Sequence, residues 1–186
     1  IAGGSVVRGI ALPGAGAGLS RKDLDGLVTE AQSLGAKGLI WAVVEEGGLR
    51  SSVKAEFLGA LVDAFAATPG DLICLVADEL EAALAVLGGL RTRLADRFGL
   101  IAPDTWAPLW VVDFPMFEHD DDAQRWNAVH HPFTSPKDGH EDWLETDPGR
   151  CVAKAYDVVL NGIELGGGSV RIHREEVQSK VFRALK

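Results

Sequence analysis

Two acidic residues late in the chain have a spacing that could hold a divalent cation. Asn161-Gly162 separates two β-rich runs, and Asn-Gly is typical of a two-residue hairpin turn. Such a turn pairs Val159 with Glu164 and makes Asp157 a diagonal neighbour of Glu164, roughly 7–8 Å away between backbones. Carboxylates beside glycine backbone suit Mg²⁺, a hard cation that also takes phosphate oxygens. The alternative is two solvated acids on an open hairpin.

The same turn predicts which side chains of the hairpin share a face. Because side chains alternate along a strand, we expect Asp157, Val159 and Glu164 on one face, together with Gly166 and Gly168. Asp157 should then pair with Gly166. The opposite face should belong to the core and carries Val158, Leu160, Ile163 and Leu165.

Arg171 follows the two acids, but its spacing from Glu164 would place the two side chains on opposite faces of a regular strand. It lies an odd number of residues after Glu164, so a regular strand would point the two side chains to opposite faces. A bulge within residues 166–168 would reverse the alternation, and we predict one there. The guanidinium fork could then bind a ligand carboxylate. Otherwise Arg171 would be a strand-end arginine paired with a nearby acid.

His130-His131 is the third candidate, in a segment that Pro132 and Pro136 stiffen. Adjacent strand residues point to opposite faces, so one histidine can enter a pocket while the other braces the loop. A histidine pair alone is more often structural than functional. Binding one metal ion would require further ligands.

Three blocks of this chain resemble the bacterial-type aspartyl-tRNA synthetases, a class II family. They are residues 156–173, 130–138 and 110–115, and the similarity covers most of residues 107–186. Residues 1–100 resemble the GAD domain that this family inserts into its catalytic domain, through residues 19–22 and 35–39. The resemblance implies an α+β fold with a GAD-like two-layer domain over residues 1–105. Part of the class II antiparallel sheet would follow over residues 106–186.

The resemblance implies that the full-length protein is an aspartate–tRNA ligase of translation, with ATP and Mg²⁺ as cofactors. It would activate L-aspartate to aspartyl-adenylate and transfer the aspartyl group to tRNA. No catalytic residue is implied, because such a transfer rests on positioning and electrostatics. Asp157 and Glu164 would hold the metal, with Glu164 also binding ATP. Arg171, His130 and the adjacent His131 would bind aspartate.

The family's three class II motifs and its anticodon-binding domain have no counterpart here, so we expect the isolated chain to be inactive. The chain starts at Ile1 and its one methionine is Met116, so we expect a piece of a longer protein. That protein would be a homodimer that contacts tRNA mainly through other regions. The alternative is a non-catalytic GAD-type interaction module related to the tRNA-dependent amidotransferases. Residues 107–173 favour the ligase.

Composition limits the classes of partner and the compartment. A net charge of −9 makes the chain a poor stand-alone nucleic-acid binder, and we expect no DNA partner. We expect no membrane partner either, because no apolar run reaches membrane-spanning length. Cys74 and Cys151 lack the spacing of a zinc site, which is typical of reduced cysteines in a cytoplasmic protein.

Local patterns predict the elements that must position these residues. Ser20 and Asp23 form a capping box for a helix that ends at Gly35. Alternating strands and helices over residues 1–100 would by order suggest a parallel sheet, whereas the resemblance implies an antiparallel one, which we adopt. The expected strands are 5–12, 38–45, 72–77, 109–114, a short strand leading into His130-His131, and a hairpin over 156–172. The other expected helices are 54–66, 79–98 and 174–186.

The segment 100–108 is the expected domain boundary. The second domain has too few strands to close a core, so we predict an exposed sheet face or an added partner. We expect all the tryptophans in packing positions, namely Trp41, Trp106, Trp110, Trp126 and Trp143.

Overall fold

A computed structural model describes residues 4–54 and 58–186 of the chain. Contacts divide it into two compact units, Ile1–Pro103 and Asp104–Lys186. Both units combine helices with antiparallel sheets, which confirms the α+β class. That residues 1–105 form a GAD-like domain and residues 106–186 a partial catalytic domain stays a prediction.

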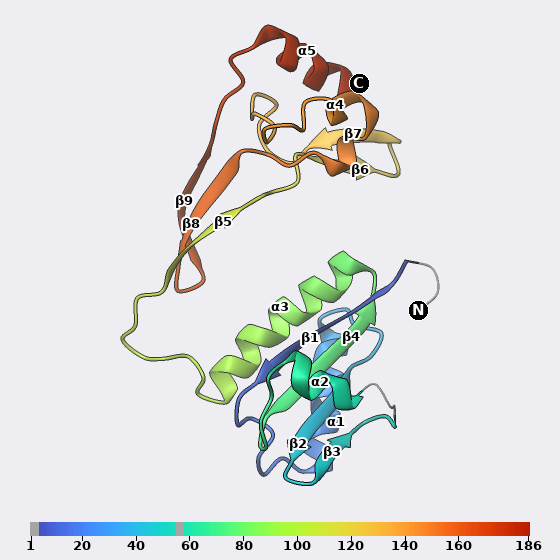
Figure 1. Ribbon diagram of the computed structural model, residues 1–186, viewed down its shortest axis with the longest axis vertical. Coiled ribbons are helices and arrows are strands. Elements are labelled where there is room, and N and C mark those ends of the chain that lie inside the picture. The colour runs from blue at the N-terminus through green and yellow to red at the C-terminus, as the bar shows by residue number, and fades with distance from the viewer. Residues whose placement is uncertain (1–3, 55–57) are drawn as a thin grey trace. The chain divides into compact units, whose positions relative to one another are not determined.

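The first unit contains a four-stranded sheet in the order β1-β4-β2-β3 (Figure 1). All neighbouring strands are antiparallel, so the parallel sheet suggested by element order is wrong. The strands are β1 (Val6–Leu12), β2 (Ile40–Glu45), β3 (Gly48–Ser51) and β4 (Leu72–Asp78). β3 was not predicted.

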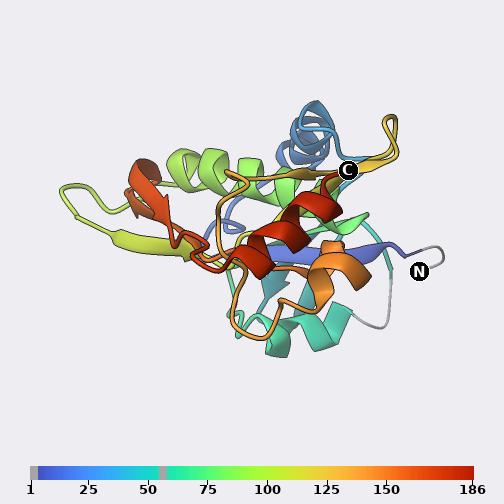
Figure 2. The same ribbon diagram turned by 90° about the horizontal axis from the view of Figure 1, so that it is seen from above.

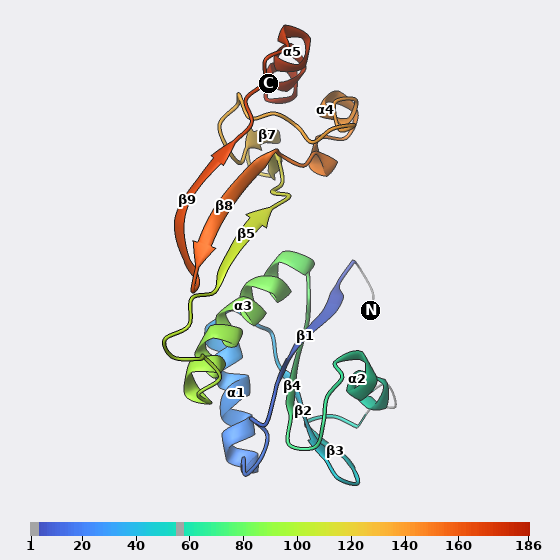
Figure 3. The same ribbon diagram turned by 60° about the vertical axis from the view of Figure 1, so that its left-hand side comes forward.

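Helices cover both faces of this sheet (Figure 3). The helices are α1 (Arg21–Ser33), α2 (Leu58–Ala64) and α3 (Leu80–Arg97). α1 and α3 form a full layer over one face, and the short α2 adds a partial third layer to the two-layer arrangement expected. Because β4 is central and covered on both faces, its sequence is a continuous apolar run rather than an alternating one. Residues 55–57 of the predicted helix 54–66 lie outside the described residues.

The start and end of α1 follow the predicted signals. The Ser20 side chain accepts from the backbone N–H of Asp23 at 3.2 Å, and the Ser20 N–H donates to the Asp23 carboxylate at 2.9 Å. This capping box lowers the pKa of Asp23, mainly through its hydrogen bond with the Ser20 side chain. Gly35 has φ of +100°, a conformation that suits glycine after a helix end.

The second unit contains a three-stranded sheet in the order β5-β8-β9 and a small hairpin (Figure 1). Figure 2 shows the two α-helices of this unit, α4 in orange and α5 in red, side by side. The strands are β5 (Pro108–Val112), β6 (Phe117–Asp120), β7 (Arg125–Ala128), β8 (Ala155–Leu160) and β9 (Ile163–Ser169). The helices are α4 (Trp143–Thr146), the 3₁₀ helix η1 (Pro148–Arg150) and α5 (Glu175–Ala184). β6, α4 and η1 occupy segments that we expected to be loops.

The β5-β8-β9 sheet has exposed apolar side chains on both faces, since consecutive residues of β5 are exposed, so the predicted exposed sheet face is present. The exposed side chains are Leu109, Trp110, Val111, Val112, Tyr156, Ile163 and Leu165. The expectation that Ile163 and Leu165 belong to the core is therefore wrong, since they are 67% and 62% exposed. The packing expected of Trp106 and Trp110 is wrong for the same reason. Among the described residues, no helix combines the length and apolarity needed to cross a bilayer.

Candidate functional site

The hairpin of β8 and β9 turns at Asn161-Gly162 and contains one irregularity. Leu160 pairs with Ile163 and Val159 with Glu164, as predicted. The next pair is Val158 with Gly166, so Leu165 is an extra, unpaired residue. The ladder then runs regularly through the glycines, and the bulge therefore lies just before the segment in which we predicted it.

The bulge at Leu165 changes the register of the glycines. Asp157 pairs with Gly167 rather than with Gly166, so the predicted partner is wrong. Gly167 and Ser169 take the face that we expected Gly166 and Gly168 to share with Asp157. The extra residue also compensates for the odd spacing of Arg171, which comes to the same face as Glu164.

The predicted site residues converge on one cavity of about 280 Å³, which we call the front pocket. Its wall contains all five of the residues singled out from the sequence. The lining consists of His130, His131, Thr134, Ala155, Asp157, Glu164, Gly167, Gly168, Ser169 and Arg171. Thr134, Ala155 and Ser169 were not predicted as site residues, and Ala155 has no chemical signal in the sequence.

The charged side chains of the front pocket have no partners within the described part of the chain. Asp157, Glu164 and Arg171 make no side-chain hydrogen bond or ion pair there. The alternative interpretation of Arg171, a strand-end arginine paired with a nearby acid, is therefore wrong. Glu164 and Arg171 are exposed to water, and the few polar groups that converge on this cavity are free to bind a ligand.

The glycines of β9 provide clearance for side chains of β8. A Cβ on Gly167 would lie 2.0 Å from Oδ1 of Asp157, so this carboxylate lies across the bare backbone. A Cβ on Gly168 would lie 2.8 Å from the hydroxyl of Tyr156. These distances explain why glycine suits both positions, because a side chain there would displace Asp157 or Tyr156.

The two histidines both line the front pocket and differ in their partners. The His130 ring packs edge-on against Phe114 with centroids 5.0 Å apart, and its Nε2 is buried without a hydrogen-bond partner in the described residues. His131 Nδ1 accepts from the backbone N–H of Phe133 at 3.2 Å, so this ring braces the loop. A buried nitrogen without a partner costs free energy, which a ligand could recover.

Two ion pairs hold the segment that carries the histidines. Lys137 Nζ lies 2.6 Å from Asp113 at the end of β5, and Lys154 Nζ lies 2.6 Å from Asp138. Backbone hydrogen bonds join the same segment to the residues that flank the hairpin. The Ser135 N–H donates to the Val170 carbonyl after β9, and the Lys154 N–H before β8 donates to the Ser135 carbonyl. This backbone layer forms a wall of the front pocket.

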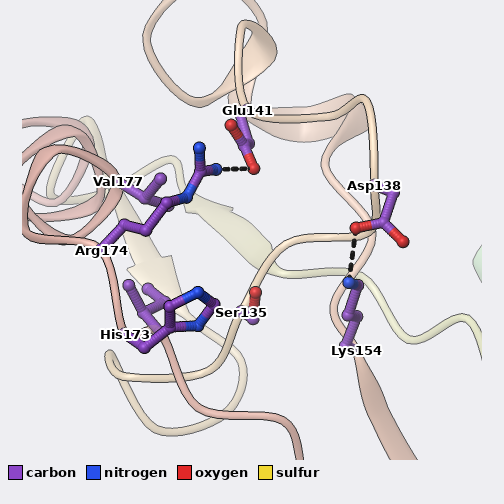
Figure 4. A pocket seen from close by; sticks show the side chains of 8 residues that line it. Ser135, Asp138, Glu141, Lys154, His173, Arg174 and Val177 are labelled. Carbon is purple, nitrogen blue, oxygen red and sulfur yellow. Dashed lines mark hydrogen bonds and ion pairs between the residues drawn. The ribbon is translucent and has the colours of Figure 1, made fainter.

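A second cavity, of about 320 Å³, is lined by residues adjacent in sequence to those of the front pocket, and Figure 4 shows it from close by. We call it the back pocket, and it is lined by Ser135, Asp138, Glu141, Lys154, Ile172, His173, Arg174 and Val177. Neighbouring residues alternate between the two pockets: Thr134 and Arg171 line the front, Ser135 and Ile172 the back. The wall between the pockets is thus one backbone thick.

The charges of the back pocket are paired with one another. Figure 4 shows Arg174 bonded to Glu141 and Lys154 bonded to Asp138. The hydrogen bond from Lys154 lowers the pKa of Asp138, and the hydrogen bond to Glu141 raises the pKa of Arg174. These pairs leave the back pocket without a free charge of either sign among its lining side chains.

The front pocket fits a magnesium–nucleotide complex better than a bare metal ion. Among the described residues, no group of three or more histidine, cysteine or acidic side chains converges as a metal site. Mg²⁺ usually takes one or two protein carboxylates and completes its shell with water and phosphate oxygens. Asp157 and Glu164 supply two carboxylates, and the bare Gly167 backbone leaves space beside them.

One family model, described as tRNA synthetases class II (D, K and N), matches residues 20–186. The match includes every residue of the front pocket and most of the first unit.

Proposed function

Because this chain belongs to the class II tRNA synthetases (D, K and N), we propose that its full-length protein is the aspartate–tRNA ligase among these aminoacyl-tRNA ligases. The observation that supports aspartate is the unpaired guanidinium of Arg171 in the front pocket. A guanidinium forms two parallel hydrogen bonds with a carboxylate. It would repel the ammonium group of lysine, and the side-chain amide of asparagine offers it only one oxygen.

The carboxylates of the front pocket serve to bind the nucleotide. In this proposal Asp157 and Glu164 bind Mg²⁺ with ATP, and Gly167 gives the phosphates access to the backbone. Bound magnesium would neutralise the charge that builds up on the phosphates as the adenylyl group is transferred and pyrophosphate leaves. Arg171, His130 and His131 hold the aspartate, with the unpartnered Nε2 of His130 as one available hydrogen-bonding atom.

The reaction requires no nucleophile from the protein. An oxygen of the α-carboxylate of aspartate, not the side-chain carboxylate held by Arg171, attacks the α-phosphorus of ATP, and the bond to the bridging oxygen breaks to release pyrophosphate. A terminal hydroxyl of the tRNA then attacks the carbonyl carbon of aspartyl-adenylate, and AMP leaves. The protein holds the reacting groups in line and stabilises their charge, which accounts for much of the rate enhancement in such transfers.

We assign the first unit to a GAD-like insertion domain over residues 1–105, and residues 106–186 to part of the catalytic domain. The antiparallel sheet of the first unit supports this assignment, as does the separation of the two units near residue 103. The family match through the front pocket favours the ligase over a non-catalytic GAD-type interaction module.

The test is ATP–pyrophosphate exchange by the full-length protein with aspartate, asparagine or lysine as the amino acid. The proposal predicts exchange with aspartate and little with the other two. Exchange that prefers lysine or asparagine would refute the assignment. If none of the three amino acids supports exchange, the result would favour the interaction module.

A further inference from the structure

The floor of the front pocket holds a pair of hydroxyl groups with no assigned role. Thr134 is 1% exposed, and its Oγ1 lies 3.3 Å from Oγ of the half-buried Ser169. Thr134 is also the direct antiparallel partner of Arg171. Because Ser169 and Arg171 are two residues apart, their side chains flank Thr134 on the same face.

The burial of Thr134 determines the direction of the hydrogen bond. A buried hydroxyl proton needs an acceptor, and among the described residues Ser169 is the one side chain that bonds to Oγ1 of Thr134. Thr134 therefore donates, and Ser169 accepts. The proton of Ser169 is then left without a protein acceptor, on a side chain that lines the pocket.

We propose that Ser169 donates a hydrogen bond to the side-chain carboxylate of aspartate held by Arg171, and that Thr134 is its positioning residue. This inference rests on the proposed function. A carboxylate has about four lone-pair sites, so an arginine fork leaves room for another donor. The bond from Thr134 polarises the Ser169 hydroxyl and strengthens its donation. Ala155, the small partner of Ser169 across the strands, leaves space for the ligand.

The phosphates of the nucleotide could also accept the hydrogen bond from Ser169. The experiment must therefore distinguish the aspartate carboxylate from the ATP phosphates as the acceptor. The full-length protein is assayed by ATP–pyrophosphate exchange, and KM is measured for aspartate and for ATP separately. Ser169→Ala should raise KM for aspartate about tenfold, the lower end expected for one hydrogen bond to a charged group. KM for ATP should stay within about twofold.

The positioning role of Thr134 is tested with one variant that removes its hydroxyl and one that keeps it. Thr134→Val removes the hydroxyl and should raise KM for aspartate about threefold, as for one neutral hydrogen bond. Thr134→Ser keeps the hydroxyl and should restore the wild-type value. Ser135→Ala, which removes the hydroxyl that faces the back pocket, is the matched control and should leave both KM values unchanged.

Each outcome is decisive. An unchanged KM for aspartate in Ser169→Ala, with normal wild-type exchange, overturns this inference alone. A rise in KM for ATP instead assigns the hydroxyl to the nucleotide and also overturns it. If the wild-type protein shows no aspartate-dependent exchange, the proposed function fails and this inference fails with it.

Discussion

The front and back pockets share one wall and contain the same kinds of charged residue, yet their charges are arranged in opposite ways. In the back pocket, Arg174 and Lys154 each bind an acid of the protein itself. In the front pocket, Arg171, Asp157 and Glu164 have no such partners within the described residues. The back pocket is also the larger of the two, at about 320 against 280 Å³.

This difference shows that cavity size and charge content alone do not identify a ligand site. Ion pairs near a surface satisfy each other and contribute little, so the back pocket gains nothing from an incoming ligand. Side chains held together without partners remain available for a ligand. The ion pair of Lys154 with Asp138 in the back pocket instead holds in place the segment that carries His130 and His131.

The largest difference between the pockets should appear when one acid is neutralised in each. Glu164→Gln should lower kcat/KM for ATP by about 100-fold or more in the full-length protein, comparable to the loss of one charge-stabilising group. Glu141→Gln, in the back pocket, should change it by less than about threefold, since exposed pairs are weak. Equal losses in pyrophosphate exchange would contradict the distinction.

Adding a side chain at Gly167 should have a second, smaller effect on activity, and Gly166 offers a matched control. Gly167→Ala places a Cβ 2.0 Å from Oδ1 of Asp157, so the carboxylate must move. We expect a loss in kcat of about 10-fold to 100-fold, because small displacements of positioning groups are costly. Gly166→Ala meets nothing within 4 Å and should behave as wild type. Similar kinetics for the two variants would show that the position of Asp157 is unimportant.

The back pocket should respond in stability rather than in activity. A double-mutant cycle with Arg174→Ala and Glu141→Ala should give a coupling energy of about 0.2–1 kcal/mol, as for a pair that is largely exposed. Urea unfolding of the 186-residue chain measures this energy. A coupling of several kcal/mol would mean that the back pocket is a much stronger structural element than we infer.

The smallest expected effect is a pH dependence confined to acid. The hydrogen bond from Lys154 lowers the pKa of Asp138 below its ordinary 3.8. A lowered carboxyl pKa stabilises the fold above the ordinary value, and this contribution is lost as the pH falls through the lowered one. Unfolding curves of wild type and Asp138→Asn should therefore differ at neutral pH and converge below about pH 3.8. A difference that grows with acidity would contradict the assigned cause.

Local sequence signals predicted the elements better than the contacts between them. The Asn161-Gly162 turn and the Ser20 capping box are local, since backbone conformation and short hydrogen bonds determine both. The bulge was misplaced by one residue because the glycines meet a different requirement, which is to accommodate Asp157 and Tyr156 from the neighbouring strand. Only the pairing of the two strands reveals that requirement.

The back pocket had no sequence signal at all. Its paired residues are far apart in the chain, with Glu141 and Arg174 separated by a helix and a hairpin, and only the tertiary fold joins them. β6 and α4 were missed for a related reason. They are short and lack a periodic apolar pattern, so packing around Leu144 and Phe117 determines them rather than local preference.

Arg171 and Arg174 test the central claim most directly, because they lie three residues apart and line opposite pockets. Both are replaced by alanine, one at a time, in the full-length protein, and aspartate-dependent ATP–pyrophosphate exchange is measured. We predict that Arg171→Ala lowers kcat/KM for aspartate by about 100-fold, the scale expected when one partner of a bound charge pair is removed. Arg174→Ala should stay within about threefold of wild type. Full activity in Arg171→Ala, or equal losses in both variants, would contradict the account.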